Sequence, residues 1–277
     1  MNQLPLEKRT KIIEMLVEGM SIRAVSRITG ASKNTIAKLL VEVGTACQCY
    51  HDQVVVGLDT KRVQCDEIWS FVYSKEKNVP DGIEGEAGDV WTWVGIDADS
   101  KLVASWFVGE RGQESAQAFM YDLAGRFLNR VQLTTGGLGR YYEAVMQAFE
   151  TGVDCARLIK SYGNEDGTSE KGDSQAECIG ITKKNISGNL DAKNNSISKV
   201  ERQNLTMRMH MRRFARSTNA SNKKIEFHCH AIALHLVYYN FVKIHNALRV
   251  TPAQQAGITN YLWEVSDILK LTNKYSN

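Results

Sequence analysis

The 277-residue sequence contains no apolar run long enough to cross a bilayer, and its N-terminus has no hydrophobic core of a secretory signal. We therefore expect a cytoplasmic protein without a membrane partner. Its six cysteines are then expected to be reduced thiols. The segment Cys47-x-Cys49-x-His51 resembles half of a zinc site, but no second pair follows at zinc-finger spacing, so a structural role is favoured.

The sequence also has little excess charge of either sign. It contains 34 Lys and Arg against 31 Asp and Glu, and a net charge of +3 does not by itself indicate a nucleic-acid partner. The basic residues are nevertheless concentrated near the N-terminus and in residues 196–216. The composition, 43% hydrophobic and 23% charged, is that of a globular protein large enough for one large domain and a smaller module.

Residues 196–216 contain neither Gly nor Pro and are rich in Arg, Met, Gln and Leu, so they predict a helix. Glu201 is the single acid among its basic side chains. Spacings of four, three and four place Glu201, Leu205, Arg208 and Arg212 on one stripe of such a helix. The carboxylate would then lie among phosphate-binding groups. An ordinary charged surface helix is the alternative.

The first 48 residues predict three helices. Apolar residues recur at helical spacing in residues 6–18, and Ser21 and Ser32 stand where they can cap the two helices that follow. The third helix has an apolar face, and the side chains expected to be exposed at its front are Lys33, Asn34, Thr35 and Lys38. This pattern is typical of a helix-turn-helix, in which such side chains contact base edges and phosphates. A three-helix protein-interaction bundle is the alternative.

From residue 63 onward the sequence predicts a mixed α/β sheet. The expected strands are 63–73, 90–96, 102–108, 131–135 and 156–162, and the turn between the second and third predicts an antiparallel hairpin. Helices are expected at 113–128 and 138–149, and residues 163–195 predict a long or partly disordered loop. This order of elements is that of the ribonuclease H-like fold, here a five-stranded mixed sheet flanked by helices.

Several runs of this part of the chain resemble the insertion sequence 1 type of DDE transposase. The matching runs are Asp66-Glu-Ile-Trp-Ser-Phe71, Trp91-Thr-Trp-Val94, Gln132-Leu-Thr-Thr135 with the following Gly-Leu, Tyr141-Tyr-Glu-Ala-Val145, Val200-Glu-Arg-Gln-Asn-Leu-Thr-Met-Arg208, Tyr239-Asn-Phe241 with His245, and Thr251-Pro-Ala253. The resemblance covers nearly everything from about residue 60 to 262. The N-terminal zinc-binding segment of some family members has no counterpart in this sequence.

The resemblance implies metal-dependent DNA strand cleavage and transfer. In such a reaction two divalent ions, Mg²⁺ or Mn²⁺, position the phosphate and stabilise its charge, and carboxylates hold the ions. Asp66 would bind both ions and Glu201 one of them. Adjacent carboxylates on a strand point to opposite faces, so only one of Asp66 and Glu67 can enter such a site. The family's second Asp falls at Gly136 in this chain, where Thr-Thr-Gly-Gly-Leu replaces Thr-Thr-Asp-Gly-Leu.

Glycine supplies no metal ligand, so we expect the metal site to be impaired. The nearby acids are poor substitutes, because Asp97 and Asp99 belong to the hairpin turn and Glu114 begins the next helix. Histidines in residues 225–248 offer no metal site either, since His228, His230, His235 and His245 do not share a helical face.

The sequence thus predicts a helix-turn-helix domain (1–48), a linker (49–62), a ribonuclease H-like domain (63–216) and a helical extension (217–277). By resemblance, the chain is a transposase that binds terminal inverted repeats of double-stranded DNA as a homodimer or higher homo-oligomer, associated with a prokaryotic nucleoid. Phosphates would be bound by the N-terminal basic side chains and by Lys199, Arg202, Arg208, Arg212 and Arg213. A non-catalytic regulator derived from a transposase, and a nuclease or resolvase of the same fold, are the alternatives.

Overall fold

The computed structural model describes residues 4–83, 85–162, 178–215 and 223–275. Its helices are α1 (Leu6–Val17), α2 (Ile22–Thr29), α3 (Lys33–Val54), α4 (Gln113–Ala124), α5 (Tyr141–Phe149), α6 (Ser198–His210), α7 (Ile225–Val237), α8 (Pro252–Gln255) and α9 (Val265–Tyr275). Its strands are β1 (Arg62–Val72), β2 (Gly88–Asp97), β3 (Val103–Gly109), β4 (Val131–Thr135), β5 (Val153–Tyr162) and β6 (Cys178–Ser187). Within these ranges no helix combines the length and apolar character needed to cross a membrane.

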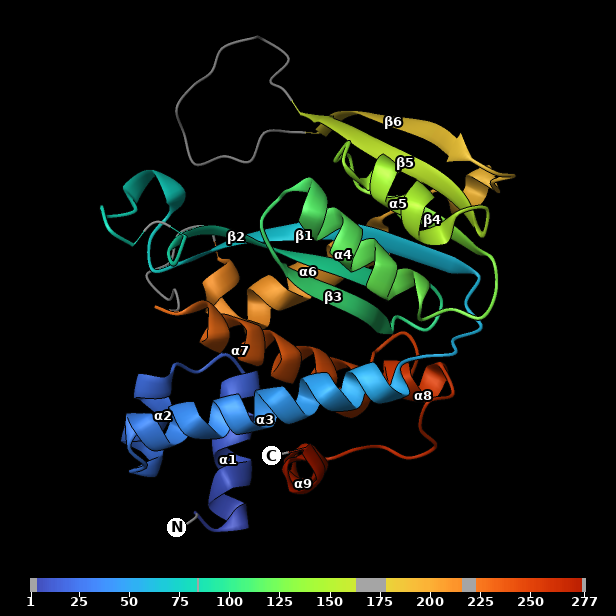
Figure 1. The fold of residues 1–277 in the computed structure, drawn as a ribbon. Helices are drawn as coiled ribbons and strands as arrows, with labels where there is room; N and C mark the ends of the chain where they lie inside the picture. Colours follow the sequence, from blue (N-terminus) through green and yellow to red (C-terminus); the bar gives the residue numbers. More distant parts are fainter. Residues whose placement is uncertain (1–3, 84, 163–177, 216–222, 276–277) are drawn as a thin grey trace.

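The strands form one mixed sheet in the order β3-β2-β1-β4-β5-β6 (Figure 1). The neighbours β1, β2 and β3 are antiparallel, which confirms the predicted hairpin. Strands β4 and β5 run parallel to β1 and to each other, and β6 is antiparallel to β5. The first five strands therefore have the arrangement expected for a ribonuclease H-like sheet.

The sixth strand corrects the prediction of a loop over residues 163–195. Residues 178–187 pair with β5 along most of its length. Every residue from Cys178 to Asn185 except Gly180 is exposed, so the segment has no buried face and no alternating apolar pattern. The backbone ladder with β5 makes it a strand. The rest of the predicted loop up to residue 177 lies outside the described residues.

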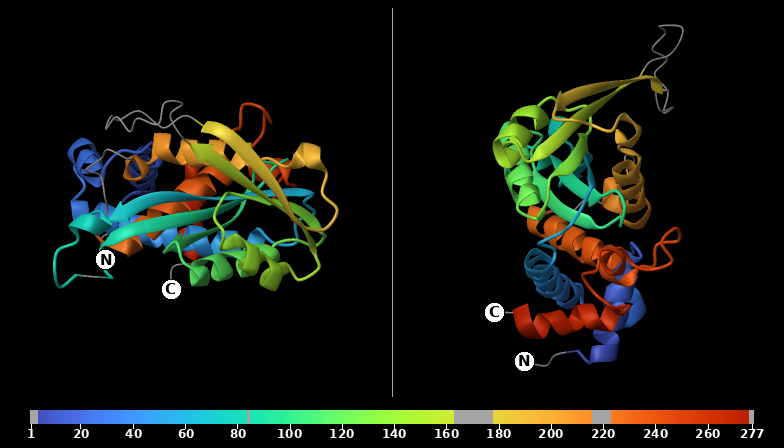
Figure 2. Two further views of the ribbon diagram at one scale, coloured as in Figure 1. Left: turned by 90° about the horizontal axis from the view of Figure 1, so that it is seen from above. Right: turned by 90° about the vertical axis from the view of Figure 1, so that its right-hand side faces the viewer.

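Helices flank the sheet on both faces. Figure 2 shows α4 and α5 on one side of it and α6 on the other. The buried core includes Ile68 and Trp93 from the sheet, with Phe119 and Val145 from α4 and α5. Side chains of β1 that face α6 thus lie apart from those that face α5, as the period of two along a strand requires.

The N-terminal helices pack on the C-terminal helices. Helix α7 lies between the sheet and α3, and α9 packs against α1 and α3 (Figure 1). The predicted caps are present, because the Ser21 and Ser32 hydroxyls accept hydrogen bonds from the Ala24 and Thr35 amides at 3.2 and 3.1 Å. Helix α3, however, continues through residues 49–54, which were expected to be linker. His51, the buried residue of this stretch, contacts the Val103 carbonyl oxygen of β3 and so joins this part of the helix to the sheet.

Candidate active site

Asp66, near the middle of β1, and Gly136, directly after β4, lie side by side where the parallel pairing of these two strands ends. The Gly136 amide donates to the Cys65 carbonyl oxygen at 2.9 Å, which continues the β1–β4 ladder by one residue. A Cβ atom at position 136 would lie 2.5 Å from Asp66 Oδ1. A side chain at this position would therefore point at the Asp66 carboxylate, where the resemblance expects a second acid.

Helix α6 brings Glu201 to the same place. Asn204, three residues after Glu201 on the same helical face, donates from Nδ2 to Asp66 Oδ2 at 3.1 Å. The charge of Glu201 contributes to the perturbed titration of Asp66, so the two carboxylates are close enough to repel. The three positions singled out from the sequence, Asp66, Gly136 and Glu201, are thus brought together.

Two polar partners of this cluster were not assigned a role from the sequence. Asn204 stands in the run that carries the resemblance, and its spacing from Glu201 is the signal that could have identified it. Lys160 on β5 forms an ion pair with the Glu201 carboxylate. Its position two residues after Leu158 places it on the α6 face of the sheet, but only the strand register makes that visible.

The Asp66 carboxyl group is strongly perturbed. Burial raises its pKa, and the negative charges of Glu67 and Glu201 raise it further, to about 7. The hydrogen bond from Asn204 acts in the opposite direction but is the weaker influence. Burial and the neighbouring acids therefore both disfavour the ionised form of Asp66.

The neighbouring carboxylate, Glu67, points to the opposite face and has its own partners there. It accepts hydrogen bonds from Arg111 at 3.0 and 2.5 Å and from the Tyr141 hydroxyl at 3.1 Å. The Arg111 guanidinium also stacks on the Trp91 ring, 4.4 Å from its centre. Glu67 is therefore a buried structural acid, and Asp66 is the residue available to the site.

The donor set fits a divalent metal poorly. Magnesium and manganese require several oxygen ligands, and a two-ion site needs carboxylates from separate elements. Position 136 offers no side-chain oxygen, and Lys160 already pairs with Glu201. Across the part of the chain that the structure describes, no group of three or more His, Cys, Asp or Glu side chains is arranged to hold a metal.

Helix α6 is shorter than the predicted helix over residues 196–216. It ends at His210, and Met211 is extended, with φ −129° and ψ 96°. Arg212 therefore falls in the short 3₁₀ turn η3 (Arg212–Phe214) and leaves the stripe of Glu201 and Arg208. Met211 and Phe214 are both buried, so the extended residue and the turn after it pack into the core. Residue 216 lies outside the described residues.

Arg212 instead contributes to a basic cleft. This cleft, about 800 Å³ in volume, separates the turn between α1 and α2 from the end of α6. Its lining includes Arg23, His210, Arg212 and Arg213 but no acid. Arg213 is held by a hydrogen bond to the Phe227 carbonyl oxygen at 3.3 Å, and burial lowers its pKa to about 10. Of the two arginines of η3, Arg212 is the exposed one.

A second group of cations lies at the start of α6. Lys199 and Arg202 are exposed there. Burial lowers the pKa of His245, and the positive charges of Lys101, Arg202 and Lys199 lower it further. These charges therefore lie close together, on elements distant in sequence. The carboxylates of the site thus have a positively charged surface beside them.

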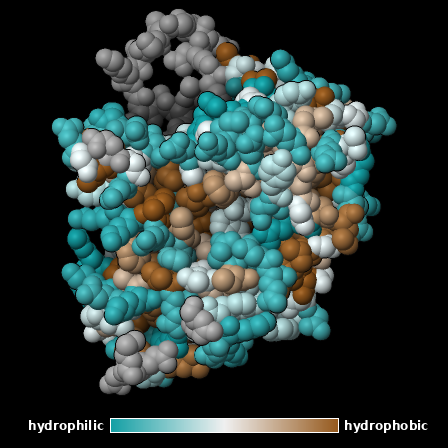
Figure 3. Space-filling view, in the orientation of Figure 1, coloured by the Kyte–Doolittle hydropathy of each residue, from teal (hydrophilic) through white to brown (hydrophobic). Residues whose placement is uncertain are grey.

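The front of α3 is open to solvent. Lys33, Asn34, Thr35 and Lys38 are all exposed, and Ile36 and Leu39 turn inward as predicted. In the space-filling view, much of the visible surface is hydrophilic, with hydrophobic residues appearing between polar ones (Figure 3). The polar front of α3 is accessible to a partner in this structure.

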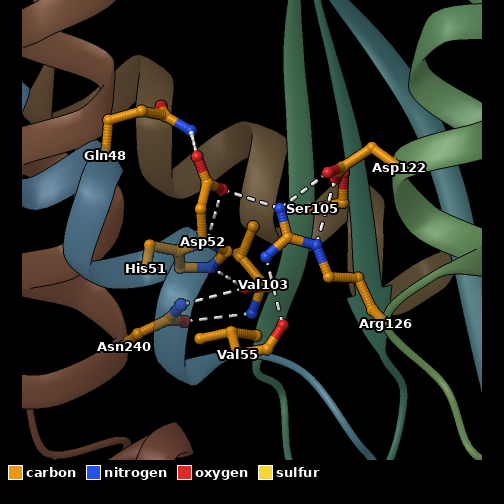
Figure 4. Close-up of polar contacts among 9 residues, drawn as sticks. All are labelled: Gln48, His51, Asp52, Val55, Val103, Ser105, Asp122, Arg126 and Asn240. Carbon is orange, nitrogen blue, oxygen red and sulfur yellow. Dashed lines mark hydrogen bonds and ion pairs between the residues drawn. The ribbon is translucent and has the colours of Figure 1, made fainter.

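A buried arginine joins the end of α3 to α4 (Figure 4). Arg126 donates to Asp52 of α3 and to Asp122 of α4, both at 2.7 Å, and to the Val55 carbonyl oxygen at 3.1 Å. Burial alone would raise the pKa of Asp52, but the hydrogen bonds from His51 and Arg126 outweigh it and lower the pKa. Both carboxylates thus form charge-assisted hydrogen bonds with the guanidinium.

The same network fixes α3 and the π-helical turn η4 (Tyr238–Val242) to the sheet. His51 Nε2 is 3.0 Å from the Val103 carbonyl oxygen. The Asn240 side chain donates to that oxygen at 2.9 Å and accepts from the Val103 amide at 3.0 Å. His51 is therefore a structural residue, and Cys47 and Cys49 are free thiols on α3. The C-terminal histidines His228 and His235 are buried in α7.

Comparisons with known proteins give no family. No protein-family model and no curated protein matches this sequence. Among solved structures, a pre-cleavage Mos1 transpososome matches 95% of this chain and 82% of its own, at 10% identity and a TM-score of 0.29. A Mos1 strand transfer complex matches 95% and 81%, at 10% identity and 0.25, and Bacillus subtilis endonuclease V matches 50% and 60%, at 10% and 0.21. TM-scores this low carry no conclusion about this chain.

Proposed function

We propose that this chain is a DNA-binding protein of the DDE transposase type, similar to the insertion sequence 1 family, with an incomplete metal site. In this proposal the N-terminal helices act as a helix-turn-helix that binds terminal inverted repeats, and the sheet domain holds the DNA strand that an intact enzyme would cleave. The observation that carries the proposal is the meeting of Asp66, position 136 and Glu201 on one face of the sheet.

The sheet topology supports the assignment of this cluster as a site. Asp66 lies within β1, position 136 directly follows the adjacent parallel strand β4, and Glu201 comes from a helix more than 60 residues later. The strand pairing and the packing of α6 on β1 thus bring one position from each of three separate elements into one cluster. Carboxyl groups with a strongly raised pKa are enriched at functional sites, and burial with the charges of Glu67 and Glu201 raises the pKa of Asp66 to about 7.

DNA binding is supported by the placement of the basic side chains. Lys33 and Lys38 flank Asn34 and Thr35 on the exposed front of α3, so phosphate-binding and base-reading groups lie together. Arg212 lines a cleft that also contains Arg23 of α2. The cations beside α6 would neutralise phosphates next to the site.

Catalysis is the part of the family's function that this chain is proposed to lack. Magnesium or manganese would be held by Asp66 and Glu201 alone, and Lys160 competes with any ion for Glu201. The same observation favours the second candidate, a regulator that binds the repeats without cleaving them. A nuclease or resolvase is less well supported, because it would not need the exposed front of α3.

Restoring the acid tests the proposal. Binding sites are first selected from a pool of random duplexes, and cleavage of DNA carrying the selected site is then measured with Mg²⁺ or Mn²⁺. We expect the natural chain to bind without cleaving and Gly136→Asp to gain metal-dependent cleavage. Gly136→Ala is the matched control, since it adds the Cβ atom next to Asp66 Oδ1 without the carboxylate.

Stability gives a second readout for the same variants. Without metal, Gly136→Asp places a third carboxylate beside Asp66, so its Tm should fall below that of Gly136→Ala and recover when Mg²⁺ or Mn²⁺ is added. Robust cleavage by the natural chain would refute the impaired site. Absence of any duplex binding would refute the proposal as a whole.

A further inference from the structure

A row of side chains crosses the sheet from the candidate site to its edge. The register aligns Cys65 of β1 with Thr135 of β4 and Thr135 with Arg157 of β5, so the next positions, Asp66, Gly136 and Leu158, are neighbours in turn. Leu158 is paired with Lys183 of β6. Neighbouring residues in aligned strands point to the same face, so Lys183 faces the same side as Asp66.

The opposite face carries a matching lysine. Lys184 is paired with Arg157 and directly follows Lys183 in the strand. Because successive side chains of a strand point to opposite faces, Lys184 points to the face covered by α4 and α5. Both Lys183 and Lys184 are exposed, and strand β6 contains no acid. The two lysines differ in the face they present, but not in residue type, exposure or strand.

From this register we infer that the α6 face of the β5–β6 ribbon is a second DNA-backbone contact, in which Lys183 binds a phosphate beside the Asp66 site. This inference rests on the proposed function and identifies the path that the DNA strand bound at the Asp66 site follows beyond that site. Three strand spacings separate Asp66 from Lys183, or about 14 Å. That distance corresponds to about four base pairs at roughly 3.4 Å per step.

The positions of the charged side chains support a DNA path from the Asp66 site toward β6. Lys160, on β5, is paired with Glu201, and the adjacent strand β6 carries the exposed Lys183 on the same face of the sheet. Lys199 and Arg202 at the start of α6 lie near Lys101 of the β2–β3 turn, and β2 and β3 are on the opposite side of β1 from β6. A DNA strand crossing Asp66 would thus meet cations before and after the acidic cluster, and the repulsion from the acids would be offset on both sides.

Lysines on an edge strand have a simpler role, which is to prevent pairing with another sheet. That role requires charge on the strand but does not distinguish its two faces. It therefore predicts equal effects of Lys183 and Lys184 on self-association and none on DNA affinity. The exposed Ile179 and Ile181 make pairing of β6 with a second copy of the chain the other possible use of this edge.

The test compares Lys183→Ala with Lys184→Ala in the full chain. Fluorescence anisotropy measures the affinity for a labelled duplex across 50 to 300 mM salt, with Tm and sedimentation measured on the same samples. Loss of one phosphate contact should reduce the logarithmic salt slope by about 0.9 and weaken binding about fivefold at roughly 150 mM salt. We expect this for Lys183→Ala, and a slope within error of the natural chain for Lys184→Ala.

Equal slopes for the two variants would overturn the inference, as would an unchanged slope in both. A change in sedimentation without a change in slope would assign the edge to a second copy of the chain instead. These outcomes are separable from failure of the proposed function, in which the natural chain itself would not bind DNA. Sequence preference in competition binding should be unchanged in Lys183→Ala, because a phosphate contact carries no base information.

Discussion

Replacing Asp66 with Asn should stabilise this protein, and by an amount that grows with pH. The Asp66 carboxyl is buried beside Glu67 and Glu201, which together raise its pKa from 3.8 to about 7. Asparagine has the same shape, keeps an oxygen to accept the hydrogen bond from Asn204, and carries no charge at any pH. The variant therefore removes only the cost of ionising this position in the folded state.

The sign and size follow from proton linkage. A pKa raised on folding gives a stabilising contribution that is complete below the unfolded value and is lost as pH rises through about 7. The difference of about 3 pH units corresponds to ~4 kcal/mol. Relative to the natural chain, Asp66→Asn should gain about 2 kcal/mol at pH 5 and about 4 kcal/mol at pH 8.5. At the higher pH this is a rise in Tm of about 10 °C.

Thermal unfolding followed by circular dichroism, from pH 5 to 8.5 in EDTA, measures this gain. The adjacent acid is the control: Glu67→Gln loses an ion pair with Arg111 at 2.5 Å and should be destabilised. A gain for Asp66→Asn that is the same at every pH would show that ionisation of Asp66 is not costly in the folded protein. A loss of stability above pH 7 would refute the clustering of acids around it.

Two further predictions concern α3 and its attachment. Asn34→Ala should reduce the preference for the selected DNA site by about 1 to 3 kcal/mol, whereas Lys38→Ala should weaken binding to all duplexes alike. Competition binding at fixed salt distinguishes the two effects. An unchanged preference in Asn34→Ala would argue against base reading by this helix. Arg126→Ala should lower stability by about 2 to 3 kcal/mol, because Asp52 and Asp122 lose their shared partner. Thermal unfolding measures this loss, with substitution of the exposed Arg130 by Ala as the control. Equal Tm values for the two variants would contradict the prediction.

Most of the sheet could be predicted from the sequence, because its strands have buried faces. Strand β1 is mostly buried and is therefore rich in β-branched and aromatic residues, which predict a strand at this position. Strand β6 has no such signal. Its residues are exposed on both sides, so the backbone pairing that forms it leaves no pattern in the side chains.

The candidate site was partly predictable for the same kind of reason. The resemblance located Asp66, Gly136 and Glu201, and the structure brings these positions together. It did not locate Lys160, which reaches Glu201 only through the register of β5. The end of α6 was also missed, because the helix-forming composition continues past His210 although Met211 is extended and buried.

The uninterrupted course of α3 has a consequence for the DNA itself. Its 22 residues span about 33 Å, and its far end is fixed to the sheet through Arg126, His51 and Asn240. On the proposed function, the front of α3 and the Asp66 site then behave as one rigid body. The rotational position on the duplex of the sequence that α3 reads, relative to the DNA strand at Asp66, is then fixed. An insertion of about five base pairs between them would turn the strand to the wrong side of the duplex, whereas about ten would restore its orientation at a distance the rigid body does not span.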